Sequence, residues 1–401
     1  GADDRAAKAM TTQRKIRVLH VGSTLGMGGG ETWLMALLKH WRASGMVEMD
    51  ILLTSGRRGI FDGEAAALGA RLFYLPYSRG NLAGFVSAFR KILKEGEYDA
   101  LHDHSDYATG WRYLMATGVL PPVRVTHVHN PWLHIEANYA VNPTRKAAYI
   151  LGEQFVYAFA THVCGTSKKI LADYGFQPGR QRPSISAVHC GIDVSKFNAP
   201  RADDRASVLE EFGWPRDAKV ILFAGRLDRA VAFDHPQNHK NSWFALNVAK
   251  LAFERDPTIR FLMAGDSAGT GAELGRQIRK WGLSNQLRII GIRQDIPRLM
   301  RAAKALLFPS RQEGLGMVAV EAQAVGLPVL ASTAVPTEAM VIPSLYRSLP
   351  LEAPLEAWAE ALLERALQPD YPLAACRDAL EKSPFSIASS ARSLETIYRD
   401  R

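Results

Sequence analysis

Short apolar runs rich in β-branched residues alternate along this chain with longer segments whose apolar residues recur every three or four positions. This alternation predicts strands buried on both faces and separated by amphipathic helices, as in a parallel, doubly wound α/β sheet. In the first half we expect helices over 31–44 and 82–94, with strands at 16–21, 50–54, 71–75, 100–104, 123–129, 161–166 and 185–189.

The same pattern restarts at residue 219, so the 401 residues predict two α/β domains of ordinary size. The expected strands there are 219–224, 259–264, 287–290, 305–308 and 328–331, and the expected helices are 243–254, 272–281, 297–303 and 317–325. We assign 1–15 to a disordered arm, 16–198 and 199–386 to the two domains, and 387–401 to a last helix that is free to return to the first domain.

The segment 308–332 carries the most informative chemistry. A strand ends at Phe308, a loop with Glu313 and two glycines follows, and a helix then carries Glu321 in its second turn. Glycines allow a ligand to approach the backbone, and the N–H groups of a helix start attract phosphate. Carboxylates accept hydrogen bonds from the paired hydroxyls of a sugar. The segment therefore predicts a site for a sugar diphosphate.

This segment resembles the C-terminal signature of the retaining GT-B glycosyltransferases, in particular family 4. Phe-Ala-Gly-Arg-Leu at 223–227, Phe-Leu-Met-Ala-Gly-Asp at 261–266 and the stretch 290–300 are similar to further family motifs. The segment 190–197 resembles the family's linker, with Cys190 where asparagine is common. The resemblance covers nearly the whole chain from Ile16 and implies a GT-B fold, two Rossmann-like domains facing a cleft.

The resemblance also implies roles for single residues. Glu321 would bind the ribose, Glu313 the hydroxyls of the donor sugar, and Arg226 and Lys240 the diphosphate. Lys240 lies fourteen residues after Arg226, where the family usually has about five; either an inserted loop returns Lys240 to its place or Arg229 replaces it. The backbone of Arg293 would face the base. The other donor-binding residues in this half would be Gly265, Gly314, Leu315, Gly316, Met317 and Val318.

In the first domain, a glycine-rich loop follows the first strand, and its Gly29 and Gly30 are expected near the donor diphosphate. An NAD site is disfavoured, because Asp50 begins the second strand and no acidic residue ends it. By resemblance, His129 lies near the anomeric carbon and counts with Glu313, Arg226 and Lys240 as catalytic. The acceptor-side residues would be His104, Asp106 and Glu31.

The pairs His102/His104 and His127/His129 have the spacing of possible metal ligands. We nevertheless expect no metal and no cofactor, because enzymes of this kind act without one. For His102 and His127 we favour a structural place in the core.

Charge and cysteines limit the setting of the protein. The net charge is +9, of which residues 1–196 contribute +7. Nucleic acid is disfavoured because no known binding motif is present, which leaves an anionic membrane surface or simple solubility. Three scattered cysteines, the absence of an apolar run of membrane-spanning length and the polar start of the chain predict a cytoplasmic protein, with peripheral membrane contact left open.

The expected activity is transfer of a hexosyl group from a nucleoside-diphosphate sugar to an acceptor hydroxyl with retention of configuration. A UDP-sugar is favoured over GDP-mannose. The acceptor is expected to be a lipid-linked saccharide in cell-surface polysaccharide or glycolipid synthesis, and Leu82–Lys94, Trp111, Trp132 and Leu133 motivate contact with a membrane. The alternatives are a small soluble acceptor and a UDP-sugar 2-epimerase of the same fold.

Overall fold

The computed structural model describes residues 14–177, 179, 182–199, 203–229, 235 and 238–401. Most of the expected arm at 1–15, and part of the loop between Leu227 and His239, lie outside these residues. The chain forms two compact units. Unit 1 contains Gly1–His129, Asn142–Gly191 and Ile387–Arg401, and unit 2 contains Asn130–Val141 and Ile192–Ser386.

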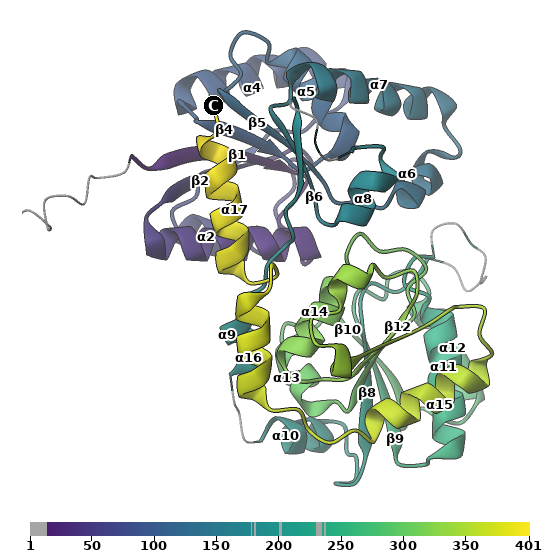
Figure 1. Ribbon diagram of the computed structural model, residues 1–401. Coiled ribbons are helices and arrows are strands. Elements are labelled where there is room, and N and C mark those ends of the chain that lie inside the picture. Colours follow the sequence, from purple (N-terminus) through teal and green to yellow (C-terminus); the bar gives the residue numbers. More distant parts are fainter. Residues whose placement is uncertain (1–13, 178, 180–181, 200–202, 230–234, 236–237) are drawn as a thin grey trace, which may run out of the picture. The chain divides into compact units, whose positions relative to one another are not determined.

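Unit 1 is built on a seven-stranded parallel sheet in the order β3-β2-β1-β4-β5-β6-β7 (Figure 1). Its strands are β1 (Ile16–Gly22), β2 (Val47–Leu53), β3 (Leu72–Tyr74), β4 (Ala100–Asp103), β5 (Val123–Val128), β6 (His162–Gly165) and β7 (Ser184–Ala187). Its helices are α2 (Gly29–Ser44), α3 (Asp62–Ala67), α4 (Leu82–Gly96), α5 (Thr109–Met115), α7 (Pro143–Phe159), α8 (Lys168–Asp173) and α17 (Ile387–Arg399).

Unit 2 has a six-stranded parallel sheet in the order β10-β9-β8-β11-β12-β13. Its strands are β8 (Lys219–Ala224), β9 (Ile259–Ala264), β10 (Leu287–Gly291), β11 (Ala305–Phe308), β12 (Val329–Ser332) and β13 (Tyr346–Leu349). Its helices are α6 (Trp132–Tyr139), α9 (Val194–Asn198), α10 (Asp204–Glu211), α11 (Ser242–Arg255), α12 (Gly271–Lys280), α13 (Ile296–Ala302), α14 (Met317–Ala324), α15 (Leu355–Ala366) and α16 (Leu373–Lys382).

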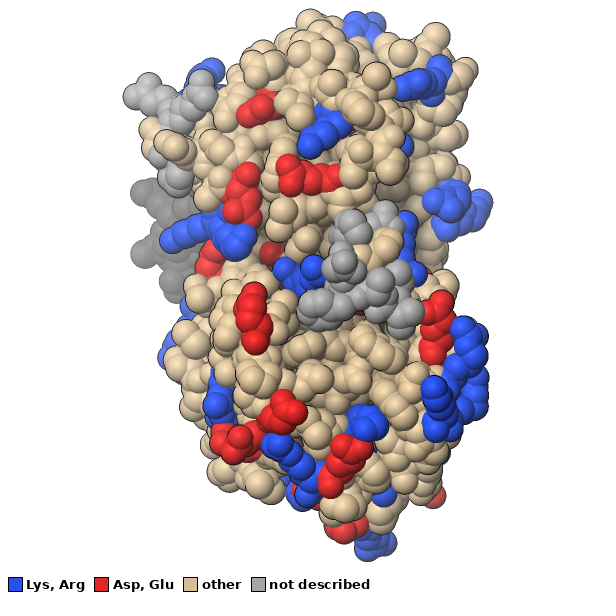
Figure 2. Space-filling view, turned by 90° about the vertical axis from the view of Figure 1, so that its right-hand side faces the viewer, with Lys and Arg blue, Asp and Glu red and all other residues tan. Residues whose placement is uncertain are grey.

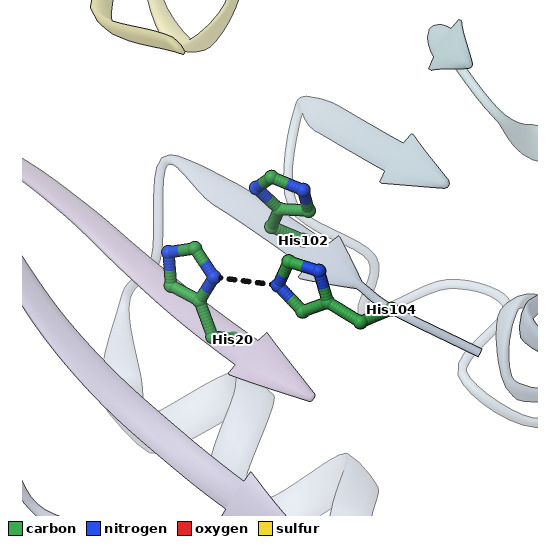
Figure 3. A group of neighbouring side chains, drawn as sticks. All are labelled: His20, His102 and His104. Carbon is green, nitrogen blue, oxygen red and sulfur yellow. Dashed lines mark hydrogen bonds between the residues drawn. The ribbon is translucent and has the colours of Figure 1, made fainter. Parts of the chain in front are cut away.

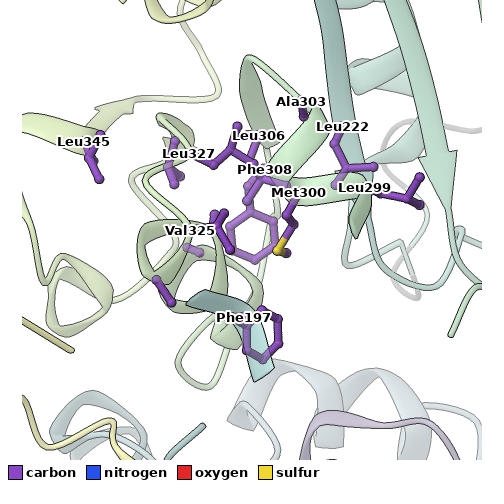
Figure 4. Close-up of a cluster of buried hydrophobic side chains, with 14 of the residues drawn as sticks. Phe197, Leu222, Leu299, Met300, Ala303, Leu306, Phe308, Val325, Leu327 and Leu345 are labelled. Carbon is purple, nitrogen blue, oxygen red and sulfur yellow. The ribbon is translucent and has the colours of Figure 1, made fainter. Parts of the chain in front are cut away.

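The sheet of unit 2 is buried on both faces because alternate residues of each strand enter different apolar clusters. Val220 and Leu222 of β8 join the cluster that contains Phe308, whereas Ile221 and Phe223 join the cluster on the other face. Figure 4 shows part of the first cluster, including Phe308 beside Leu306 and Met300. Two buried faces explain why the strands are continuous apolar runs in the sequence.

Two unit boundaries differ from the predicted ranges. Unit 2 begins at Ile192 instead of residue 199, because Val194 and Phe197 belong to its core. Residues 130–141, which include α6, also belong to unit 2 although they follow β5 of unit 1. Both differences depend on tertiary contacts, because the composition of neither segment indicates that it belongs to unit 2.

Secondary structure was predicted well around the strands and missed in places. The strand β13 and the helices α3, α5 to α10, α15 and α16 were not predicted. The expectation that Asp50 begins the second strand was wrong, because β2 starts at Val47 and Asp50 lies in its interior. There Asp50 is buried and accepts a 2.6 Å hydrogen bond from Arg71, a long-range pairing that sequence pattern does not show.

The last helix, α17, packs in unit 1, where Figure 1 shows it in yellow beside α2. Its apolar face buries Leu394 and Tyr398, and Glu395 accepts a 2.9 Å hydrogen bond from the indole N–H of Trp41 in α2. The helix therefore completes the core of a unit whose other elements lie more than 190 residues earlier in the chain.

The residues that motivated the membrane prediction differ in their exposure. On the face in Figure 2, basic and acidic side chains are interspersed and most of the surface is uncharged. Trp111 is half-buried and donates a 2.8 Å hydrogen bond to the carbonyl of Ala148. Trp132 is also half-buried, whereas Leu133 is exposed. No helix in the described residues has the length and apolar character needed to cross a membrane.

Candidate active site

The sheet of unit 2 reverses its strand order between β8 and β11, the place where open parallel sheets bind ligands beyond the strand ends. Gly225 follows β8 and Gly265 follows β9, and their φ angles are 156° and 149°. A Cβ atom on Gly265 would lie 1.9 Å from the carbonyl oxygen of Gly225. Close backbone packing at the strand ends therefore requires glycine at position 265, one of the predicted donor-binding residues.

A lysine and a glutamate meet at this edge of the sheet. Lys240 Nζ lies 2.5 Å from Glu313 Oε1, and the Glu313 side chain is only 10% exposed. The ammonium also lies 5.6 Å from the centre of the Phe308 ring, at the end of β11. The structure thus brings two of the four predicted catalytic residues into direct contact.

The segment before α11 explains how Lys240 reaches Glu313 from its unusual sequence position. Asp228 accepts hydrogen bonds from the backbone N–H groups of Lys240 and Ser242, at 3.0 and 2.8 Å. Asn241 has a left-handed backbone with φ of 62°, and its side-chain amide donates to the carbonyl of Pro309. Asp228 and Asn241 therefore hold Lys240 at the strand end beside Glu313, and its contact with phosphate stays a prediction.

The N-terminus of α14 lies directly after this loop. Its first turn has no side-chain cap within the described part of the chain, so the partial positive charge of the helix start is not offset locally. Gly316 precedes the helix with φ of 90°, and a Cβ there would lie 2.9 Å from Phe308 and from Val335. The predicted backbone donors Met317 and Val318 lie in this first turn, and Gly314, Leu315 and Gly316 directly precede it.

Glu321 lies in α14 and is partly buried. Burial raises the pKa of its carboxyl group to about 7, while the positive charge of Lys196 in α9 acts in the opposite direction. A carboxyl group in this state gains stability as an anion once ligand hydroxyls donate hydrogen bonds to it. This property suits the predicted ribose contact.

Two histidines that the sequence analysis did not select lie near the predicted cations. The ring centres of His134 in α6 and His239 are 4.0 Å apart. Burial lowers the pKa of each histidine to about 4, and the positive charges of Arg226 and Lys240 add to this effect. The neutral rings sit in a positive field of the kind that attracts a diphosphate. In the sequence, only its neighbour Lys240 could have indicated that His239 belongs to the site. No residue close to His134 in the sequence indicates the same for His134.

The other two donor-site candidates of unit 2 differ in how their side chains are held. Arg226 is exposed after β8 and has no hydrogen bond or ion pair to another described residue. Arg293 instead makes two hydrogen bonds to Asp295, at 2.7 and 2.8 Å, and one to Glu211 at 2.7 Å. Arg293 lowers the pKa of Asp295 to about 2. The side chain of Arg293 is therefore engaged within unit 2, and the contact of its backbone with a base stays a prediction.

In unit 1 the strand order reverses between β1 and β4, and the predicted histidines lie there. His104 is half-buried, and its two ring nitrogens lie 2.9 Å from ring nitrogens of His20 and His129. Figure 3 shows His20 of β1 pointing toward His104, with His102 beside them. His20 was not selected from the sequence, although its place near the end of the first strand was a usable signal.

Asp106 does not have the position expected of an acceptor contact. Its side chain is buried, and its carboxylate accepts a 2.9 Å hydrogen bond from the backbone N–H of His129. It also has a left-handed backbone, with φ of 52°. Asp106 therefore holds the strand end that carries His129, because a buried carboxylate needs such donors.

The three remaining candidates of unit 1 lie at the start of α2. Gly29 and Gly30 are the first residues of the helix, whereas the sequence analysis placed them in a loop. Glu31 lies in the first turn, and burial raises the pKa of its carboxyl group, with its own backbone hydrogen bond opposing. The helix has no side-chain cap at Gly28, so its N–H groups, rather than a flexible loop, form this part of the candidate site.

The described residues include two groups with the composition of a metal site. They are His20/His102/His104 and His104/His127/His129, and in each group the candidate ligand atoms lie within 4.8 Å of one another. The expectation of no metal remains a prediction.

Comparison with known proteins gives consistent results over both units. The family model described as Glycosyl transferases group 1 matches residues 218–364, and that described as Glycosyltransferase Family 4 matches residues 27–196. The putative glycosyltransferase EpsF of Bacillus subtilis is 30% identical over 354 residues, 87% of this chain and 88% of the relative. A D-inositol 3-phosphate glycosyltransferase of Saccharomonospora viridis is 28% identical over 346 residues, covering 81% and 77%.

Solved structures support the same fold at lower sequence identity. Anabaena HepE in complex with UDP-glucose aligns with a TM-score of 0.73 and 20% identity, over 95% of this chain and 98% of that one. WaaG, described as a glycosyltransferase involved in lipopolysaccharide biosynthesis, aligns with a TM-score of 0.71 and 17% identity, over 96% and 100%. The two doubly wound parallel sheets are therefore those of a GT-B fold, as predicted.

Proposed function

This chain belongs to glycosyltransferase family 4, and from that premise we propose that it transfers a hexosyl group from a UDP-sugar to an acceptor hydroxyl with retention of configuration. The observation that carries the proposal is the contact between Lys240 and Glu313 at the switch point of unit 2, next to the N-terminus of α14. A cation, a carboxylate and free helix N–H groups are what a sugar diphosphate requires.

Different residues of unit 2 bind different parts of the donor. Glu321 accepts hydrogen bonds from the ribose, and Glu313 accepts them from hydroxyls of the sugar. Lys240, Arg226 and the first turn of α14 stabilise the negative charge that develops on the diphosphate as the glycosidic bond breaks. The ion pair holds Lys240 and Glu313 in place before the donor binds, which reduces the ordering needed in the reaction.

The proposed chemistry is front-face substitution. The acceptor oxygen attacks the anomeric carbon from the side that the diphosphate leaves, the bond to the diphosphate breaks, and a phosphate oxygen takes the acceptor's proton. This chemistry needs no bound metal or cofactor, because protein cations supply the positive charge. His129 helps to hold the donor sugar, and His104 and Glu31 lie on the acceptor side.

For the acceptor we propose a lipid-linked saccharide of a cell-surface glycan. Support comes from the structural neighbour WaaG, described as acting in lipopolysaccharide biosynthesis, and from the excess of positive charge in residues 1–196. A small soluble acceptor is the second candidate, since relatives are described as D-inositol 3-phosphate glycosyltransferases. UDP is favoured as the donor nucleotide because neighbours of the same fold are described in complex with UDP and UDP-glucose.

Calorimetric titration with UDP, GDP and a panel of their sugars, followed by product analysis with lipid-linked and soluble acceptors, tests these assignments. Glu313→Ala should lower turnover about 100-fold or more while UDP still binds. The exposed Glu356→Ala in α15 is the matched control, and its turnover should equal that of the wild type. Unchanged turnover in Glu313→Ala, or tight GDP binding without UDP binding, would contradict the respective assignment.

A further inference from the structure

Six aromatic side chains of unit 1 form one continuous hydrogen-bonded chain. From its half-buried outer end to its buried inner end it passes through His129, His104, His20, Tyr398, His102 and His127. The successive distances between the polar atoms are 2.9, 2.9, 3.4, 2.6 and 3.0 Å. We call these six residues the histidine chain.

Tertiary structure assembles the histidine chain from distant parts of the sequence. The strands β1, β4 and β5 are neighbours, and His20 is in register with His102. Tyr398 comes from α17, 296 positions from His102, and its hydroxyl joins the two histidine segments. Trp33 of α2 closes the side, with its ring centre 5.3 Å from that of His127. Without the tyrosine the chain would be two separate pieces.

Every histidine of the chain is neutral at ordinary pH. Burial lowers the pKa of His20 to about 3 and of His129 to about 4, and it lowers the pKa of the other three well below the usual value. A neutral imidazole has one N–H donor and one acceptor nitrogen, and a phenol donates once. The five hydrogen bonds can therefore all point inward or all point outward. A third arrangement, in which Tyr398 accepts from both His20 and His102, would leave its buried hydroxyl proton without an acceptor in the chain.

The inner end favours the inward arrangement. The Nε2 atom of His127 is buried and has no hydrogen bond of good geometry to a described residue. The backbone of Val188 nevertheless acts to raise the pKa of His127, which is the direction expected when a carbonyl oxygen faces a ring N–H. If Nε2 carried no proton, its lone pair would face the lone pairs of the carbonyl oxygen, which is unfavourable. The proton of His127 is thus on Nε2, and its Nδ1 accepts from His102.

Tracing the donors and acceptors from His127 to the outer end of the chain determines the tautomer of His129. His102 donates from Nε2 and accepts from Tyr398; Tyr398 accepts from His20; His20 accepts from His104, and His104 accepts from Nε2 of His129. This leaves Nδ1 of His129 as a hydrogen-bond acceptor. The nitrogen that carries the proton in a histidine is set by the bond that its other nitrogen makes.

We infer that Tyr398 is a positioning residue, which acts through the histidine chain to keep His129 in the Nε2-protonated tautomer, so that Nδ1 accepts a hydrogen bond from a hydroxyl of the donor sugar. This inference rests on the proposed function for the sugar contact of His129. The tautomers themselves are a property of the protein without substrate.

The test compares Tyr398→Phe with Tyr113→Phe. Both tyrosines are buried in unit 1, and the Tyr113 hydroxyl bonds to Thr126, 3.0 Å away and outside the chain. Tyr398→Phe should lower kcat about tenfold, the effect of one buried hydrogen bond, with the donor KM changed about twofold or less. Tyr113→Phe should keep the wild-type kcat, and both variants should show the same far-UV spectrum as the wild type.

Two-bond ¹H–¹⁵N spectra of histidine-labelled protein provide a readout independent of activity. The wild type should show His129 protonated at Nε2 alone, and Tyr398→Phe should show a mixture of tautomers, whatever the enzyme's substrate proves to be. Protonation of His129 at Nδ1 in the wild type would overturn the inference, as would equal kcat values in the two variants. One equivalent of zinc in the purified protein, lost in His104→Ala, would also overturn it, because a metal would replace the hydrogen bonds.

Discussion

Replacement of Glu321 by glutamine should make the protein more stable at alkaline pH. Burial raises the pKa of this carboxyl from an ordinary 4.5 to about 7, with Lys196 opposing the rise. The folded protein therefore binds this proton more tightly than the unfolded chain does. Glutamine has nearly the same shape as the protonated acid but never has to be ionised in a buried place.

The size and sign of the effect follow from the two pKa values. Between pH 4.5 and 7 the unfolded chain has lost the proton while the folded protein retains it, so stability falls as pH rises. At about 1.4 kcal/mol for each pKa unit, the loss reaches about 3 kcal/mol above pH 7 as an upper value. Below pH 4.5 both states are protonated, so the protein does not suffer this loss of stability.

Urea unfolding of the wild type and of Glu321→Gln at pH values from 5 to 9 measures the difference directly. The two proteins should have similar unfolding free energies at the acidic end, and the variant should be more stable by about 3 kcal/mol at the alkaline end. Glu360→Gln, on the exposed face of α15, serves as the control and should show no trend. A constant difference between wild type and Glu321→Gln across this range would refute the reasoning, because it would mean that Glu321 titrates normally.

Three further outcomes are expected. If ionised Glu321 accepts the ribose hydroxyls, the Kd of UDP measured by calorimetry should rise about tenfold for each pH unit below 7, and Glu321→Gln should bind weakly without that slope; a parallel slope in both proteins would contradict the contact. Lys240→Met should lower kcat/KM about 100- to 1,000-fold, whereas Arg229→Met should stay within about threefold, and the reverse ranking would assign the phosphate to Arg229. Gly265→Ala should destabilise the protein by about 3 kcal/mol in urea unfolding, since its Cβ would lie 1.9 Å from the carbonyl oxygen of Gly225, and a wild-type midpoint would show that this backbone can separate.

Much of the fold was readable because a buried parallel strand has a local pattern. The ranges 219–224, 259–264 and 305–308 were predicted with the bounds that the structure has. Each is an apolar run that is covered on both faces, so its composition alone identifies it. The strand β13 was missed because Tyr346–Leu349 is short and carries Arg347 and Ser348, as an edge strand covered on fewer sides can.

The candidate site was readable in part for the same reason. Glycines, carboxylates and a helix start follow the strand ends in a fixed order, so Glu313 and Glu321 could be selected from the sequence pattern, and the resemblance to the family added Gly265. By contrast, His134 and Asp228 were missed, because one comes from a segment that joins unit 2 from between elements of unit 1, and the other acts by holding a loop. Their roles depend on contacts rather than on spacing.

The sequence by itself determined the two doubly wound sheets, the family and the residues at the strand ends, because these depend on periodicity and on short ordered motifs. Only the tertiary structure decided that Lys240 reaches Glu313, that Asp106 is buried behind His129, and that Tyr398 joins the histidine chain. The physical reason is that a hydrogen bond or a pKa shift depends on distances of a few ångströms between groups that the chain separates by tens or hundreds of residues.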